Sequence, residues 1–244
     1  MRARLERYLH QVLFRGRHLA PTDPALVTEP FRSQLSRLVK LSPGASPIPG
    51  VQTFTAPDSP AIRRALAVRL LGEMATDVTI VMLCSEPEST VPHLYFEVIR
   101  DGLGARLTID LIPYVDLVEH PTWVEAVYQP LEPIRWTAIN VDGLDPDHVT
   151  GHHRLASSPW SISVVIDSPG VEWINEAVAD VLHHWVGLTT AQLPPVVHTP
   201  GDLVARDQAM RTLVAAPRAT TRWSRLDTML GEDRAAELRA LIAS

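Results

Sequence analysis

The spacing of apolar residues along the chain predicts a group of strands in the middle of the sequence, with helices before and after it. Short β-branched runs between turn residues indicate strands, and apolar residues repeated every three or four positions indicate amphipathic helices. Strands are predicted at residues 77–84, 92–100, 105–112 and 160–167. Helices are predicted at residues 2–14, 30–40, 117–128, 170–188, 202–215 and 231–243. This layout is typical of an α+β fold rather than of alternating βαβ units.

The segment at residues 61–72 has the local signals of a helix. Ser59 and Pro60, just before it, suit the N-cap and the first helical position. Local rules alone therefore favour a helix there, although the segment directly precedes the first predicted strand.

Two proline-rich stretches, residues 41–60 and 189–202, are predicted to be irregular connections. The second of them separates the main body of predicted strands and helices from the last two predicted helices. We therefore expect a single domain over residues 1–190, followed by a proline-rich link and a helical extension over residues 191–244.

Residues 91–117 read as two strands joined by a tight turn, and their polar side chains fall on one face. Side chains alternate between faces along a strand, and Asp101-Gly102-Leu103-Gly104 is typical of a turn. A four-residue loop would place Tyr95 opposite Asp110, whereas a two-residue loop would place His93 there. Both loops give the same two faces. The polar face carries His93, Tyr95, Glu97, Arg106, Thr108 and Asp110, and the apolar face carries Leu94, Phe96, Val98, Leu107, Ile109 and Leu111.

Two interpretations of this polar face are open from the pattern alone. The first is a sheet with one face in water, which is common in antiparallel sheets. The second is a ligand cleft lined by the polar face. In a partly dry cleft, neighbouring carboxyl groups such as Glu97 and Asp110 would raise the pKa of one of them. A carboxylic acid that stays protonated near neutral pH can donate a proton, and His93 could relay or orient it.

The net charge of −6 is unevenly distributed, with +7 on residues 1–70 and −14 on residues 71–200. An acidic body argues against nucleic acid as the main partner. The basic first segment could contact an acidic protein or an anionic ligand, or it could be an ordinary solvated surface. No apolar run approaches the roughly 20 residues of a membrane helix, and a secretory signal is absent from the first residues. A single cysteine, Cys84, excludes an internal disulfide and favours a cytoplasmic location.

The segment "PHLYFEVI", followed by "LTIDLIPYVDLVEHPTWVEAVY", resembles the signature of the red chlorophyll catabolite reductases. In that signature a Pro-His-x-x-x-Glu-Phe strand precedes a Leu-Asp-Leu-Leu-Pro strand, and Asp-Leu, His-Pro and a Tyr-rich helix follow. The residues that fit in order are Pro92, His93, Glu97, Asp110, Leu111, Pro113, Asp116, Leu117, His120 and Pro121. "SSPWSISVVID" and "INEAVADVLHHWVGL" resemble the family's later strand and closing helix. The family belongs with the ferredoxin-dependent bilin reductases, and the resemblance covers roughly residues 60–188.

The resemblance implies a three-layer α/β/α sandwich around a central antiparallel sheet, in which residues 63–71 form a strand and not a helix. It also implies reduction of an open-chain tetrapyrrole, such as a bilin or a chlorophyll catabolite, with no bound cofactor. External reduced ferredoxin would supply the electrons, and the protein would supply the protons. Ferredoxin would dock near the mouth of the pocket, on the basic N-terminal segment. The oligomeric state is open, a homodimer included.

The residues expected to act in this reaction lie mainly on the polar face. Glu97 falls on the family's proton-donating or substrate-contacting acid, and Asp110 and His93 would tune it or hold the substrate. The residues expected to line the pocket are Tyr95, Arg106, Thr108, Arg69 and Trp160. For Arg69 a plain surface position is an alternative, and for Trp160 the alternative is core packing. No metal is predicted, since the histidine pairs at 152–153 and 183–184 lack the spacing of a metal site.

The sequence departs from the family pattern at two places. Tyr114 and Val115 stand where the family has basic residues, and Gly187 stands where we align an acid at the end of the closing helix. These departures leave two alternatives to the reductase. One is a non-catalytic protein that binds a pigment or metabolite on the same scaffold, and the other is an enzyme of specialised metabolism with a different substrate.

Overall fold

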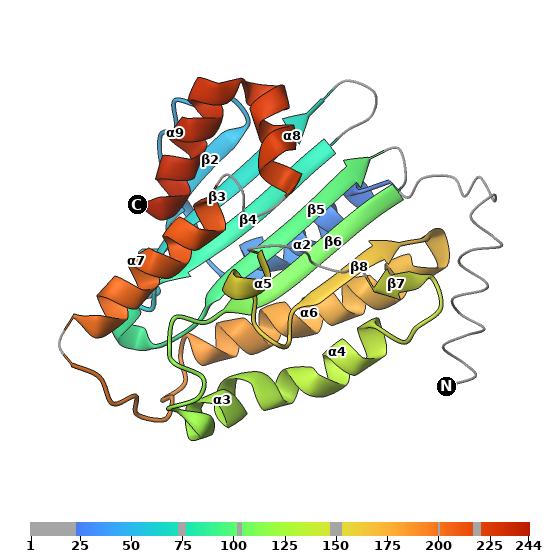
Figure 1. Cartoon of the computed structure of the whole chain (residues 1–244). Helices are drawn as coiled ribbons and strands as arrows, with labels where there is room; N and C mark the ends of the chain where they lie inside the picture. The colour runs from blue at the N-terminus through green and yellow to red at the C-terminus, as the bar shows by residue number, and fades with distance from the viewer. Residues whose placement is uncertain (1–22, 73–76, 102–103, 147–152, 200, 217–220) are drawn as a thin grey trace.

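The computed structural model describes residues 23–72, 77–101, 104–146, 153–199, 201–216 and 221–244, which form an antiparallel sheet between two layers of helices (Figure 1). In this part of the chain the sheet has eight strands in the order β1-β2-β3-β4-β5-β6-β8-β7. They are β1 (Ser42–Pro43), β2 (Val51–Thr55), β3 (Ile62–Leu71), β4 (Asp77–Ser85), β5 (His93–Asp101), β6 (Gly104–Ile112), β7 (Leu144–Pro146) and β8 (Ile162–Ile166). The first six follow chain order, so most neighbours in the sheet are also neighbours in sequence.

Strand β3 forms where local rules favour a helix, and it confirms the strand implied by the resemblance. It pairs with β2 on one side and with β4 along nearly its whole length on the other. Its side chains alternate in size, with Ala65 and Ala67 toward one helical layer and the larger Leu66, Val68 and Leu70 toward the other. Ladder hydrogen bonds and this period-two burial outweigh the helical propensity of the segment.

The hairpin of β5 and β6 has the register that the four-residue loop predicts. Tyr95 lies opposite Asp110, and Glu97 lies opposite Thr108. The two residues at the tip of the turn, 102 and 103, lie outside the described part of the chain. Both strands are central, since β5 also pairs with β4 and β6 also pairs with β8, so neither strand of the hairpin lies at an edge of the sheet.

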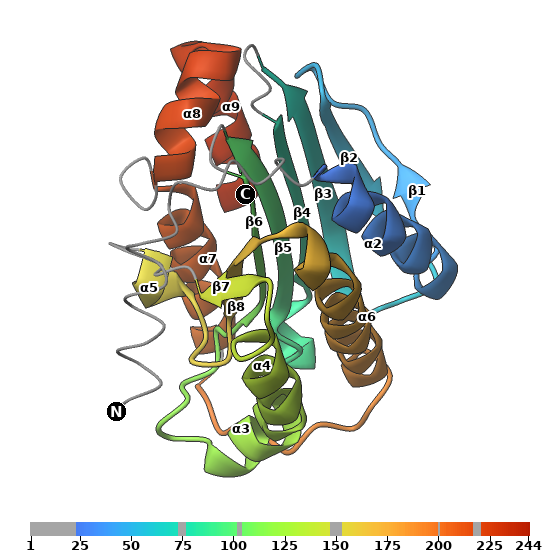
Figure 2. The same ribbon diagram turned by 90° about the vertical axis from the view of Figure 1, so that its right-hand side faces the viewer.

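One face of the sheet is apolar and is covered by four helices, as Figure 2 shows. They are α2 (Ala25–Leu38), α3 (Pro121–Tyr128), α4 (Glu132–Ala138) and α6 (Val171–Leu188). The predicted apolar face of the hairpin is confirmed, since each of its six side chains is at most 1% exposed. Phe96 stacks on Phe31 of α2 with ring centroids 3.9 Å apart, and burying such a side chain stabilises the fold by about 1.5–3 kcal/mol.

The other face is covered by α5 (His153–Ala156), α7 (Asp202–Ala215), α8 (Thr221–Leu230) and α9 (Glu232–Ala243) (Figure 1). Its apolar contacts join Ile80, Met82 and Tyr95 of the sheet to Trp223 and Leu238 of the helices. The predicted three-layer α/β/α sandwich is therefore confirmed, and residues after 201 supply much of its third layer. The division of the chain at residue 190 stays a prediction.

The predicted elements agree with the structure to different degrees. The helices at 170–188 and 202–215 appear within one residue of the predicted bounds. The helix expected from residue 117 begins instead at Pro121, because proline suits the first helical position. The prediction that 41–60 is irregular is wrong at Val51–Thr55, where β2 pairs with β3. The helices α4 and α8 were not predicted, and 3-10 helices lie at Pro87–Ser89, Gln129–Leu131 and Ser168–Gly170.

The helix predicted at residues 2–14 lies outside the described part of the chain. Among the helices that are described, none combines the length and the apolar composition that crossing a bilayer requires.

Candidate functional site

The polar face of the β5–β6 hairpin is buried. Glu97 is 6% exposed, Asp110 is 4% exposed, and His93 is fully buried. Tyr95 and Thr108, which belong to the same face, are also buried. The face lies on the side of the sheet that α5 and α7–α9 cover, so the interpretation of a wet sheet face is excluded.

Glu97 belongs to a row of oxygen-bearing side chains that crosses three strands. The Tyr95 hydroxyl donates a hydrogen bond to Glu97 Oε2 at 2.8 Å. Thr108, opposite Glu97, shares a hydrogen bond of 3.0 Å with Ser163 of β8. A carboxyl group is therefore held out of bulk water on a rigid strand, with a phenol aligned to one of its oxygens.

Asp110, on the same face, is a buried carboxyl group whose pKa is raised. The Ser158 backbone N–H donates to Asp110 Oδ2 at 2.9 Å, and the Ser158 hydroxyl lies 2.5 Å from Oδ1. Burial raises the pKa of Asp110 to about 7, although both bonds from Ser158 act to lower it. The cause is desolvation and not the predicted repulsion by Glu97. Near neutral pH, Asp110 therefore exchanges between its acid and its carboxylate form.

Ser158 is a residue that sequence reasoning missed. It lies in the "SSPW" stretch before β8, which carries part of the family resemblance. Its hydroxyl also accepts from the Trp160 backbone N–H at 3.2 Å. A serine before a proline commonly begins a turn, so the signal for a fixed hydroxyl was present, but its partner Asp110 lies 48 residues away.

His93 shares the polar face with Glu97, but its hydrogen bonds go to Ser85 and Asp207. Four residues along a strand separate the two positions by about 13 Å. The Ser85 backbone N–H donates to His93 Nδ1 at 3.0 Å, so the ring proton lies on Nε2, which donates to Asp207 of α7 at 2.7 Å. Burial lowers the pKa of His93, and the neutral ring thus joins β4, β5 and α7. Its predicted catalytic role stays a prediction.

Asp207 and Arg211 form a buried ion pair on α7 that the sequence did not reveal. Both side chains are at most 2% exposed. Arg211 Nη2 donates to Asp207 Oδ2 at 2.6 Å, and Nε donates to both carboxylate oxygens at 3.1 Å. Burial alone would raise the pKa of Asp207, but bonds from His93 and Arg211 lower it to about 2. An Asp and an Arg four residues apart usually form a surface pair, so the sequence gives no sign of burial.

The remaining predicted site residues lie in different places. Arg106 is partly buried on β6, in the polar face. Arg69 lies on the opposite side of the sheet, where it is half-exposed and 3.6 Å from Glu29 of α2. Trp160 packs with the apolar cluster of that same side and stacks on Tyr128, with centroids 4.6 Å apart. The structure therefore brings together Tyr95, Glu97, Arg106, Thr108 and Asp110, and it places Arg69 and Trp160 elsewhere.

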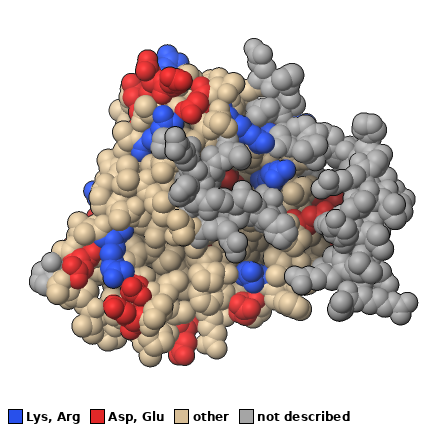
Figure 3. Space-filling view, viewed as in Figure 1, with Lys and Arg blue, Asp and Glu red and all other residues tan. Residues whose placement is uncertain are grey.

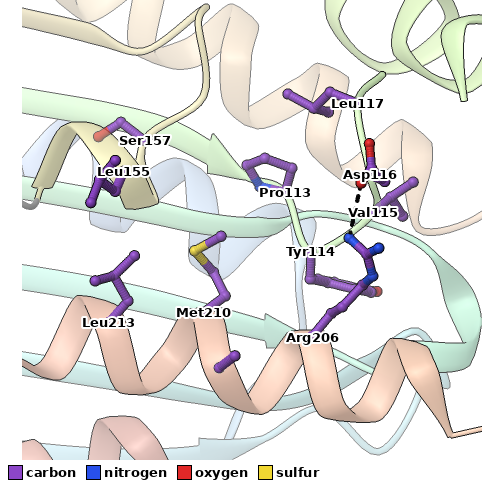
Figure 4. A pocket seen from close by; sticks show the side chains of 11 residues that line it. Pro113, Tyr114, Val115, Asp116, Leu117, Leu155, Ser157, Arg206, Met210 and Leu213 are labelled. Atoms are coloured by element: carbon purple, nitrogen blue, oxygen red, sulfur yellow. Dashed lines mark hydrogen bonds and ion pairs between the residues drawn. The ribbon is translucent and has the colours of Figure 1, made fainter. Parts of the chain in front are cut away.

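A cavity of about 400 Å³ lies at the end of β6, between the β6–α3 connection, α5 and α7 (Figure 4). Its apolar walls come from Pro113, Tyr114, Val115, Leu117, Leu155, Ala209, Met210 and Leu213, and its polar lining comes from Asp116, Ser157 and Arg206. The lining includes neither Glu97 nor Asp110. Ser157 nevertheless precedes Ser158 directly, so the cavity adjoins the loop that binds Asp110.

No three potential metal ligands gather among the described residues. His183 and His184 bond to two separate backbone carbonyls, Ala179 at 2.8 Å and Val127 at 2.7 Å. Of the other histidine pair, residue 152 lies outside the described chain, and the side chain at 153 is not described.

Comparisons with known proteins show a likeness in structure only. No family model matches the sequence, and no curated protein matches it. The structure is similar to that of phytochromobilin synthase from tomato in complex with biliverdin, with a TM-score of 0.61 and 15% sequence identity. The match covers 88% of this chain and 79% of that chain. The chain thus shares its fold with that protein, and the fold is the α/β/α sandwich that the sequence resemblance implied.

The raised pKa of Asp110 predicts a pH-dependent penalty on stability. The unfolded chain releases this proton near pH 4, whereas the folded chain retains it up to about pH 7, so folding is disfavoured progressively across that window. Asp110→Asn removes this titration. As the pH rises from about 4 to about 7, the variant should therefore gain stability relative to the parent protein, by at most about 1.4 kcal/mol per pH unit. Urea unfolding of both proteins between about pH 4 and pH 8 measures this difference.

Asp116→Asn is the control of opposite sign. Backbone N–H groups of Val118 and Glu119 lower the pKa of Asp116, so this variant should lose stability relative to the parent as the pH rises through the acidic range. A stability difference for Asp110→Asn that does not change with pH would contradict the assignment.

The buried ion pair predicts a large loss of stability when its cation is removed. Arg211→Met keeps a long side chain but leaves the buried Asp207 with a neutral His93 and only the more distant, partly exposed Arg63 at 3.8 Å, so the free energy of unfolding should fall by about 3–5 kcal/mol. Arg32→Met, which breaks the half-exposed pair with Glu29, should cost at most about 1 kcal/mol. Urea unfolding at neutral pH measures both losses of stability. Equal losses would contradict the prediction that a buried ion pair costs more to break than an exposed one.

Proposed function

We propose that this protein reduces an open-chain tetrapyrrole, or a related conjugated molecule, with electrons from reduced ferredoxin. The observation that carries the proposal is the enclosed carboxyl group of Glu97 on the covered polar face of the sheet. The fold adds support, because it is shared with a protein that was solved with biliverdin. The proposed site is the polar face itself, under the layer of α5 and α7–α9.

Glu97 is the proposed proton donor. Reducing one double bond takes two electrons and two protons, and an external one-electron carrier supplies only the electrons. After Glu97 gives up its proton, the carboxylate keeps the hydrogen bond from the Tyr95 hydroxyl at 2.8 Å. A hydrogen bond to a charged acceptor is worth about 1.5–3 kcal/mol, so Tyr95 stabilises the form that exists after proton transfer.

Asp110 is the proposed second acid. Its pKa of about 7 leaves a substantial part of the molecules protonated at neutral pH, where a general acid is most effective. Ser158 fixes the orientation of the carboxyl group through two bonds. Arg106 and Thr108, on the same face, are the proposed substrate contacts, and His93 is proposed to act by positioning β5 against α7.

Arg69 and Trp160 receive no support as substrate contacts, because both lie on the apolar side of the sheet. The proposed partner is ferredoxin, and no cofactor is proposed to remain bound. Figure 3 shows acidic and basic side chains interspersed on the face that α7–α9 form. Residues 1–22 of the basic N-terminal segment proposed for docking, residues 1–70, lie outside the described part of the chain. A cytoplasmic location and a homodimer stay proposals.

The alternative is a non-catalytic pigment or metabolite carrier on the same scaffold. Its sequence support was Gly187, where we aligned a family acid. Gly187 is exposed on α6, in the layer over the apolar face, and a side chain there would meet open space. An acid at this position would not reach Glu97 through the sheet, so Gly187 does not favour the carrier over the enzyme.

Glu97→Gln should abolish turnover and spare binding, because an amide keeps the shape and polarity of the side chain but gives no proton. We expect the rate to fall at least about 100-fold, while the dissociation constant for the pigment changes less than about twofold. The measurement is the absorption spectrum of biliverdin, or of a chlorophyll catabolite, mixed with the protein and a reduced ferredoxin system.

Glu125→Gln is the matched control, since Glu125 is exposed on α3 and should affect neither rate nor binding. Unchanged turnover in Glu97→Gln would remove the proton-donor role. A spectral shift without turnover in the parent protein would reject the reductase in favour of the carrier.

A further inference from the structure

The cavity at the end of β6 has the size and composition of a small-molecule site. Its volume of about 400 Å³ falls within the roughly 300–1,000 Å³ of ligand pockets, which are mostly apolar with a few oriented polar groups. Eight of its eleven lining residues are apolar in their side chains or, as with Tyr114, present an aromatic ring. The Tyr114 hydroxyl bonds to backbone carbonyls of residues 86, 87 and 91, so its polar end is already satisfied.

Arg206 and Asp116 face one another at one end of the cavity, and their hydrogen-bonding capacities are unequal (Figure 4). Asp116 Oδ1 accepts from the Val118 and Glu119 backbone N–H groups, and Oδ2 accepts from Arg206 Nη1 at 3.3 Å. Arg206, with five N–H donors, makes only this one long bond to the residues that the structure describes. This end of the cavity therefore has more hydrogen-bond donors than acceptors, and a ligand that complements it must supply hydrogen-bond acceptors.

We propose that this cavity binds a small apolar carboxylate, with Arg206 as the anchor of its negative end. A carboxylate can take two parallel N–H bonds from one guanidinium. Asp116 is held by backbone N–H groups of the following residues, so it orients Arg206 without occupying the cavity. The apolar part of the ligand lies against Leu155, Met210 and Leu213, where the flexible methionine adapts to its shape.

This inference goes beyond the proposed function, because the lining contains neither Glu97 nor Asp110. The carboxylate can come from two sources. One is a separate small molecule that occupies the cavity alone, and the other is an acidic side arm of a larger substrate on the polar face. Both sources share the same chemistry at Arg206, and a displacement experiment separates them.

The test uses 3-phenylpropionate as the probe, titrated into the full-length protein and followed by isothermal calorimetry or ligand-observed NMR. We expect saturable binding with one site. Arg206→Gln should weaken it at least tenfold, and the neutral analogue 3-phenylpropanol should bind the parent protein at least tenfold more weakly than the acid. Ala209→Phe, on an exposed helical position of the lining, should weaken the probe by filling the cavity.

Arg32→Gln is the matched control, because Arg32 is also a half-exposed arginine with a single acidic partner, at 3.2 Å. It should leave the affinity unchanged. Absence of saturable binding, or equal affinity in the parent protein and Arg206→Gln, would overturn the proposal. Displacement of the probe by biliverdin would assign the carboxylate to a substrate arm, and simultaneous binding would assign it to a separate ligand. Either result keeps Arg206 as the anchor, and neither depends on turnover.

Discussion

The contact between the helices α7–α9 and one face of the sheet is the constraint on which the rest of the structure depends. An antiparallel sheet can leave one face in water, and the sequence of β5 and β6 would suit that arrangement. Here the second helical layer covers the face, and its polar side chains are removed from solvent. Desolvation then raises the pKa of Asp110 and lowers that of His93. The chemical character of the face is thus a consequence of packing.

The polar side chains divide between holding the layer in place and presenting acids. His93 bonds to Asp207 across the interface, and Arg211 compensates the charge of that buried carboxylate. A buried charge is costly unless it is paired, so this cluster defines where α7 lies on the sheet. Farther along β5, the Tyr95 hydroxyl bonds to Glu97, and the Tyr95 ring packs with the apolar residues of α8 and α9.

The parts of the fold that follow from local periodicity could be predicted from the sequence. Alternation along the hairpin predicts its two faces, whereas the turn chemistry permits two registers, and only the pairing of Tyr95 with Asp110 distinguishes them. Local signals at residues 61–72 favour a helix, and pairing with two neighbouring strands overrides them. The helix at 202–215 is predicted, but its position over the polar face depends on residues 114 positions apart. The sequence therefore could not predict that the site is dry, nor that Ser158 and Asp207 contribute to it.

The central claim is that the covered polar face of β5 and β6 is a pigment site with Glu97 at its reacting end. A crystal structure of the protein with biliverdin tests this most directly. The account predicts that the pigment lies between this face and the helical layer, with a Glu97 carboxyl oxygen within about 3.2 Å of a pyrrole nitrogen or a ring carbonyl oxygen. Pigment bound on the apolar side of the sheet, or on the outer surface of α7–α9 with Glu97 still enclosed by protein alone, would contradict it.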